Sequence, residues 1–260
     1  MNKPKNIKLI ISYDGTDYSG WQRQKNKKTI QGVIEDTLRN ITGEKELKLY
    51  GSGRTDAGVH AIGQVANFKT RTNLPVDKWN IVLNNLLPRD IRVKFAKEVY
   101  YNFHARYNAK SRLYKYNVIN KFRTSQVFNA KDLFLSRYFY FYNYPLEIER
   151  MEETAQYLIG SHDFSALSCL NQKREKSIKN NFRYIKKIAI NKKGPFITFS
   201  IEADSFLYKM VRKIVGTLLE FSIMKRDPRY ILDILNERDN QKSGMVIPSS
   251  GLYLVKVKYK

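Results

Sequence analysis

The sequence predicts an α+β fold made of two ferredoxin-like halves, whose mainly antiparallel sheets join around a central cleft. Residues 1–105 read as strand, helix, strand, strand, helix, strand, which is the order of the ferredoxin-like unit. Residues 106–260 repeat that order loosely, with one extra helix and no repeat in the sequence itself. The 260 residues, 42% of them hydrophobic, are enough to bury a core in one large domain or two smaller ones.

Hydrophobic periodicity places the elements of the first half. A buried strand is expected at 6–13, where apolar residues alternate. An amphipathic helix follows Thr29, a suitable N-cap, and ends at Gly43, a suitable terminator. The remaining elements are strands at 46–51, 59–68 and 90–99 and a helix at 77–87.

The second half is placed in the same way. Strands are expected at 111–120, 184–190, 196–203 and 251–259, and helices near 146–159, 206–221 and 229–237. The lysine-rich stretches at 25–28 and 173–179 are expected to be loops, which either contact a phosphate backbone or are simply solvated.

The charge of the chain is strongly positive. Lysine and arginine number 47 against 24 acidic residues, a net charge of +23. Such a balance indicates a polyanionic partner, most often a nucleic acid. The alternative is a solvated lysine-rich surface encoded by an AT-rich genome.

Several classes of protein are disfavoured. The lone cysteine, Cys169, excludes a disulfide framework. His60, His104 and His162 lie too far apart in the sequence for helix-type zinc ligation, so no metal is expected. The apolar run near the N-terminus is too short for a signal peptide, and no stretch approaches the length of a membrane helix. We therefore expect a cytoplasmic protein.

Residues 50–61, YGSGRTDAGVHA, carry one carboxylate in a glycine-rich loop. A dinucleotide-binding loop is disfavoured, because the third glycine comes too late and a strand pattern follows. An ordinary turn, in which Asp56 bonds nearby backbone N–H groups, is the simpler interpretation. The functional alternative is an ionised nucleophile, kept charged by a guanidinium such as that of Arg54.

Two distant residues are candidates for the same site. Arg212 lies in the apolar stretch 204–219, where an arginine either pairs with a carboxylate or extends to solvent, as Lys209 and Lys213 are expected to do. Tyr114 lies on the predicted strand 111–120. It either packs as an ordinary strand residue or stacks on a base, with its hydroxyl in the site.

At these residues the sequence closely resembles the TruA family of tRNA pseudouridine synthases. The glycine-rich loop resembles the family's catalytic motif, and other similar blocks follow in the family's order over nearly the whole chain. These blocks are SYDGTDYSGWQRQ (12–24), LNNLLPRDIRV (83–93), FHARYNAKSRLYKY (103–116), GSHDFSAL (160–167), DSFLYKMVRKIVGTLL (204–219) and IPSSGLYL (247–254).

The resemblance implies a cofactor-free isomerisation of uridine to pseudouridine in the tRNA anticodon stem-loop, at positions 38 to 40. It implies that Asp56 is the nucleophile, attacking either the base or the sugar. Tyr114 would stack on the uracil, and Arg212 would pair with the carboxylate. Arg54 would assist extrusion of the target nucleotide, and Arg23 and Arg106 would contact the RNA. A homodimer that binds tRNA across both subunits is also implied.

Departures from the family pattern leave alternatives open. Ile247 stands where alanine is more usual, and Leu113 where polar residues are common beside the tyrosine. A paralogue with another RNA target would fit these differences. A non-catalytic RNA-binding or RNA-chaperone module would fit the charge and the many tyrosines. A nucleotide-binding α/β enzyme would need a helix directly after Gly58.

Overall fold

The computed structural model describes residues 3–121, 130–169 and 180–260. The lysine-rich stretch expected at 173–179 lies outside these residues. The chain forms two compact units, one of Met1–Lys110 with Tyr253–Lys260 and the other of Ser111–Leu252. That residues 1–105 and 106–260 act as separate domains stays a prediction.

The first unit follows the predicted ferredoxin-like order. Its elements are β1 (Lys5–Tyr13), α1 (Ile30–Thr42), β2 (Leu49–Gly51), β3 (His60–Thr70), a 3-10 turn (Val76–Lys78), α2 (Trp79–Leu86) and β4 (Ile91–Val99). Strand β1 pairs antiparallel with both β3 and β4, and the short β2 pairs antiparallel with β3. The last strand of the chain, β10 (Leu252–Lys258), runs parallel to β3, with Tyr253 opposite His60.

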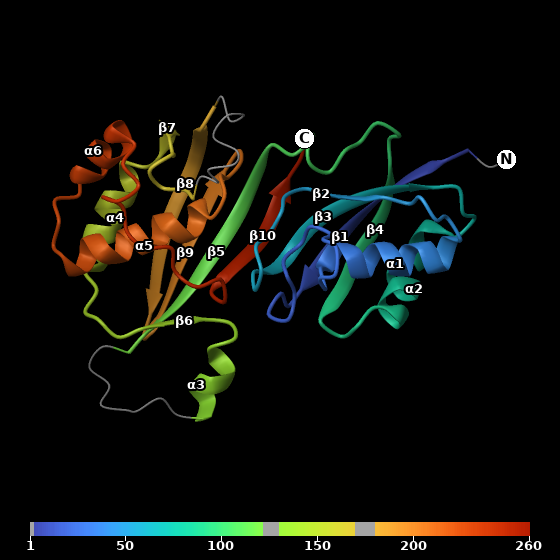
Figure 1. Ribbon diagram of the computed structural model, residues 1–260, viewed down its shortest axis with the longest axis horizontal. Helices are drawn as coiled ribbons and strands as arrows, with labels where there is room; N and C mark the ends of the chain where they lie inside the picture. Colours follow the sequence, from blue (N-terminus) through green and yellow to red (C-terminus); the bar gives the residue numbers. More distant parts are fainter. Residues whose placement is uncertain (1–2, 122–129, 170–179) are drawn as a thin grey trace. The chain divides into compact units, whose positions relative to one another are not determined.

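The alternation of buried residues along β1 and the capping residues of α1 explain why these elements form. The odd-numbered residues of β1 from Ile7 to Tyr13 are buried, and α1 and α2 cover that sheet (Figure 1). The side chain of Thr29 accepts the Gly32 N–H at the start of α1, and Gly43 ends the helix with a left-handed φ of 72°. Both capping predictions are confirmed.

The second unit is also a helix-covered antiparallel sheet. Its strands are β5 (Ser111–Asn120), β6 (Tyr140–Tyr142), β7 (Gly160–Asp163), β8 (Phe182–Lys193) and β9 (Phe196–Ala203), and its helices are α3 (Ala130–Leu135), α4 (Ile148–Gln156), α5 (Met210–Ile223) and α6 (Tyr230–Glu237). Strands β5, β9, β8 and β7 are antiparallel neighbours in that order, and β6 runs parallel to β5. The prediction of an α+β fold with mainly antiparallel strands is confirmed.

The structure corrects three details of the sequence analysis. Helix α5 begins at Met210 rather than near 206, because Lys209 adopts a left-handed φ of 59° that a helix cannot continue through. Strand β2 is shorter than expected. The elements α3, β6 and β7 were not predicted. Within the described residues, no helix is long and apolar enough to cross a membrane.

Candidate active site

Asp56 lies half-buried in the loop between β2 and β3. A turn from Asp56 to Val59 closes the loop, and β3 begins at the next residue, His60. A strand therefore follows Gly58 where a dinucleotide-binding loop would need a helix, and the nucleotide-binding alternative is wrong.

Thr55, the residue before Asp56, is fixed through both its side chain and its backbone. Its hydroxyl lies 2.8 Å from the hydroxyl of Tyr13 on β1, and its carbonyl accepts the Trp21 N–H at 3.0 Å. Both Thr55 and Tyr13 are buried, so water does not compete for their hydrogen bond. The backbone beside the carboxylate is thus held from two directions.

Gln64 on β3 anchors the first turn of the same loop. Its side-chain oxygen accepts the Ser52 hydroxyl at 2.7 Å, and its amide nitrogen donates to the Gly53 carbonyl at 2.9 Å. The Ser52 N–H also donates to the Val65 carbonyl at 2.8 Å. Ser52 and Gln64 are fully buried, so the loop has an internal polar scaffold rather than a solvated surface.

Gly51 is required by a close approach of the Trp21 indole. A Cβ atom at this position would lie 2.5 Å from two indole ring atoms. Trp21 is itself 2% exposed and cannot move aside without opening the core. The glycine that begins the motif therefore lets a tryptophan pack directly beneath the loop.

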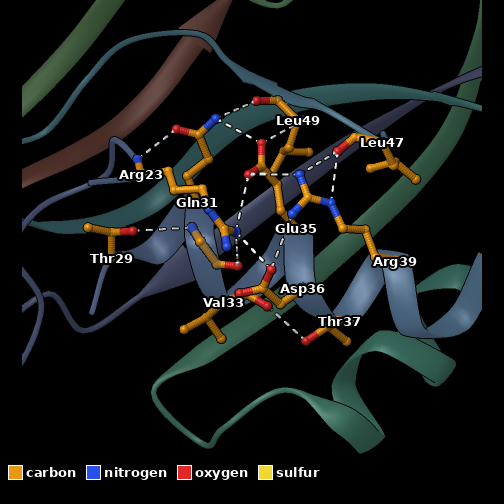
Figure 2. A network of polar contacts seen from close by, with 11 residues as sticks. Arg23, Thr29, Gln31, Val33, Glu35, Asp36, Thr37, Arg39, Leu47 and Leu49 are labelled. Carbon is orange, nitrogen blue, oxygen red and sulfur yellow. Dashed lines mark hydrogen bonds and ion pairs between the residues drawn. The ribbon is translucent and has the colours of Figure 1, made fainter. Parts of the chain in front are cut away.

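A polar network ties α1 to the strand that leads into the loop (Figure 2). The buried Glu35 accepts the Leu49 N–H at 3.0 Å, and Gln31 donates to the Leu49 carbonyl at 2.9 Å. Arg23 donates to Asp36 at 2.8 Å and lies 3.5 Å from Glu35. The hydrogen bond to Asp36 is the main cause of a raised pKa of Arg23. Arg23 is thus placed in a structural ion-pair network, and its predicted contact with RNA stays a prediction.

Arg54 and Arg106 occupy solvent-exposed positions in the first unit. Arg54 lies in the Asp56 loop, and within the described residues no hydrogen bond or ion pair of its guanidinium is seen. Arg106 lies in the segment after β4, beside the ring of Tyr107. Both are placed where a phosphate could reach them, and their RNA contacts stay predictions.

Tyr114 belongs to the second unit, on β5 opposite Ile201 of β9. It is buried, and its ring meets the ring of Phe206 edge-on at 5.1 Å. Phe206 belongs to the stretch that leads into α5. The ring of Tyr114 is therefore fixed against the segment that also carries Arg212.

Arg212 lies half-buried in the first turn of α5, rather than in the middle of a helix. Its Nε donates to the Ile247 carbonyl at 2.6 Å, and the buried Tyr116 hydroxyl donates to the next carbonyl, of Pro248, at 2.7 Å. Burial raises the pKa of Tyr116, and the nearby charge of Arg212 partly opposes that rise. Two adjacent carbonyls thus orient the arginine and a tyrosine that the sequence analysis did not single out.

Further along α5, two side chains bind the segment that leads to those carbonyls. Lys213 donates to the backbone and side-chain oxygens of Asn240, and Thr217 accepts the Gly244 N–H at 3.0 Å. The expectation that Lys213 extends to solvent is wrong. It is 4% exposed, because Asn240 satisfies its ammonium, and burial lowers its pKa.

The residues predicted to form one site are distributed over both units. Asp56 and Arg54 belong to the first, and Tyr114 and Arg212 to the second. Their meeting in one pocket stays a prediction. Sequence reasoning missed the supports Thr55, Gln64 and Tyr116, although Thr55 and Tyr116 lie inside quoted motif blocks. In the described part of the chain, no group of three or more His, Cys, Asp or Glu side chains could hold a metal ion.

A family model and several relatives with known names all point to the same family. A family model described as tRNA pseudouridine synthase matches residues 9–108 and 154–260. The tRNA pseudouridine synthase A of Thermoanaerobacter sp. (strain X514) is 44% identical over 256 residues, covering 98% of this chain and all of the relative. The protein of the same name from Acetivibrio thermocellus is 44% identical over 255 residues, with the same coverage.

A third relative, from Halalkalibacterium halodurans and also named tRNA pseudouridine synthase A, is 41% identical over 95% of this chain and 90% of its own length. Among solved structures, a Cbf5-Nop10-Gar1 complex contains a chain that matches with a TM-score of 0.35 and 11% identity. The match covers 95% of this chain and 57% of that one. This last similarity is too low to carry an argument.

Proposed function

Because the chain belongs to the tRNA pseudouridine synthase family, we propose that it converts uridine to pseudouridine in the anticodon stem-loop of tRNA, at positions 38 to 40. As a family member it is an isomerase. One observation carries the proposal for the site. The loop that presents Asp56 is held at Ser52, Gly53 and Thr55, so the carboxylate projects from a fixed backbone.

Asp56 acts as the nucleophile in this proposal. Its carboxylate attacks either C6 of the uracil or C1′ of the ribose, and the C1′–N1 bond breaks. The uracil turns and C5 bonds to C1′. The carboxylate of Asp56 is released, either displaced from C1′ by C5 or eliminated from C6. The C5 proton leaves, and N1 carries a proton in the product. The reaction is redox-neutral and needs no cofactor, because atoms are only rearranged within one nucleotide.

Arg212 pairs with the carboxylate and keeps it ionised, because a neighbouring positive charge favours the charged form. The Ile247 carbonyl supports this role, because its hydrogen bond with Nε orients the guanidinium at the first turn of α5. Tyr114 stacks on the uracil and assists removal of the C5 proton. Its edge-on contact with Phe206 supports a fixed ring plane.

Extrusion of the uridine costs a few kcal/mol, which the pocket must offset. Arg54 assists this step from its exposed position in the Asp56 loop. The net charge of +23 attracts the tRNA phosphates, so binding weakens as salt is raised. The enzyme works as a cytoplasmic homodimer that binds tRNA across both subunits.

Substitution of Asp56 tests the proposal. Asp56→Asn keeps the size of the side chain and removes the nucleophile, so we expect pseudouridine formation on an anticodon stem-loop to become undetectable while RNA binding persists. Asp77→Asn is the matched control, because it changes an exposed carboxylate in the 3-10 turn before α2. Retained activity in Asp56→Asn would refute the assignment. Pseudouridine mapping of total RNA with and without the gene identifies the modified positions.

A further inference from the structure

Three aromatic side chains form a row of tilted, adjacent rings on the surface of the first unit. The rings of Tyr50 and His104 lie 4.9 Å apart between centroids, and those of His104 and Tyr107 lie 4.3 Å apart. Tyr50 is 41% exposed and Tyr107 is 76% exposed. We call Tyr50, His104 and Tyr107 the aromatic row. The rings of Tyr50 and Tyr107 are therefore open to a partner, and their grouping with His104 distinguishes them from a single exposed aromatic residue.

Hydrogen bonds fix the backbone of the segment that carries His104 and Tyr107. The His104 N–H donates to the Asn108 side chain at 2.7 Å, and the Asn108 N–H donates to the His104 carbonyl at 3.1 Å. The Ala105 N–H donates to the buried Asn67 of β3 at 2.8 Å. The two rings therefore project from a backbone that is bonded to the sheet.

The central ring is a neutral imidazole. Its Nδ1 accepts the Arg106 N–H at 3.1 Å, which places the ring proton on Nε2. Burial and the nearby charge of Arg106 both lower the pKa of His104. The uncharged ring packs between the two tyrosines, tilted by 46° to Tyr50 and by 34° to Tyr107, and so supports both.

Positive charges accompany the rings. The guanidinium of Arg106 lies 5.8 Å from the ring of Tyr107, and Lys69 lies 3.5 Å from the ring of Tyr101 in the same segment. Lys48, two residues before Tyr50, is exposed. Rings interleaved with cations are the pattern by which proteins hold single-stranded nucleic acid, since bases stack while phosphates meet the charges.

We propose that the aromatic row stacks unpaired bases of the substrate RNA, with Tyr107 as the outermost ring. The inference rests on the proposed function and deepens it. Tyr50 is the middle residue of β2, the strand that leads directly into the Asp56 loop. The bases held by the row are therefore unpaired nucleotides beside the target uridine, and the row discriminates single-stranded loops from duplex RNA.

Binding measurements on two RNAs test the row. The probes are an anticodon stem-loop with 2-aminopurine in its loop and a blunt duplex of equal length. Loss of one stacked base should weaken binding about tenfold. We expect Tyr107→Ala to show that loss for the stem-loop and less than a twofold change for the duplex. Tyr107→Phe, which keeps the ring, should bind like the wild type, and quenching of 2-aminopurine should fall only in the alanine variant.

Tyr144→Ala is the matched control, because Tyr144 is a 60% exposed tyrosine of the second unit. An equal loss on both RNAs, or no loss, would overturn the inference. A change of oligomeric state in Tyr107→Ala, seen by light scattering, would instead show that the row packs against protein. Pseudouridine formation by the wild type is measured in parallel. Its absence, with the stacking effect intact, would refute the proposed function and leave the row in place.

Discussion

The Asp56 loop of the first unit and the Arg212 turn of the second are built in opposite ways. The loop lies in one short motif, and side chains from two different strands, Tyr13 of β1 and Gln64 of β3, hold it at several points. Arg212 is oriented by a carbonyl 35 residues further along the chain. A motif search finds Asp56 and Arg212 themselves and overlooks the residues that hold each of them.

The two regions also differ in how many independent hydrogen bonds hold each of them. The loop has anchors on β1, on β3 and at Trp21, so the loss of one leaves the others. The bonds around Arg212 form a series along one segment, from Asn240 to Pro248. We therefore expect single changes to disturb the arginine more than the aspartate.

Replacing the arginine with lysine should have the largest effect of the four changes that probe this comparison. Arg212→Lys keeps the charge but cannot both donate to the Ile247 carbonyl and reach a carboxylate with fork geometry. We expect kcat to fall on the order of 10²-fold, the usual consequence of a misplaced catalytic group. Single-turnover kinetics on an anticodon stem-loop measure this. If Arg212→Lys had the same kcat as the wild type, the positive charge at this position would be sufficient for activity without the guanidinium geometry.

Two buried tyrosine hydroxyls, one in each unit, offer a matched pair. Tyr13→Phe removes the partner of Thr55, and Tyr116→Phe removes the donor to the Pro248 carbonyl. Each should lower the free energy of unfolding by about 1 kcal/mol, measured by urea denaturation. We expect kcat to fall severalfold in Tyr116→Phe and less than twofold in Tyr13→Phe. The reverse order would contradict the proposed difference in redundancy.

The smallest effect is expected at the far end of the arginine segment. Lys213→Met removes a buried ammonium together with its bonds to Asn240, and the two effects largely cancel. We expect the free energy of unfolding at pH 7 to change by less than about 1 kcal/mol, and kcat to change less than twofold.

The pH dependence gives this variant a second readout. The pKa of Lys213 is lowered in the folded protein, so the unfolded chain binds more protons between that lowered pKa and the ordinary value of about 10.4. Wild-type stability should therefore rise with pH in this window relative to Lys213→Met. Parallel pH profiles of the two proteins would show that Lys213 keeps its ordinary pKa.

Local signals in the sequence predicted the framework well. The β1 alternation, the Thr29 cap and the Gly43 terminator each depend on neighbours within a few residues, and all three are confirmed. The start of α5 was missed because the left-handed φ of Lys209 leaves no mark in the composition. The burial of Lys213 was missed because its partner, Asn240, is 27 residues away.

In the candidate site, too, local motifs were predicted and long-range contacts were not. Motif reading picked out Asp56, Tyr114 and Arg212, but it could not supply the residues that hold them. Gln64 and Tyr116 look like ordinary strand residues until pairing brings them to the loop and to Pro248. Long-range hydrogen bonds depend on the completed fold, so a single sequence does not reveal them.

The parallel pairing of β10 with β3 has a consequence for the order of synthesis. The ribosome makes β10 after the whole second unit, yet Tyr253 on it lies opposite His60 and stacks on that ring at 4.8 Å, four residues from Asp56. The unit that carries Asp56 is therefore incomplete until the whole second unit has been synthesised. A chain that stops before β10, even with the entire Asp56 loop already made, lacks the strand that pairs with β3 beside that loop.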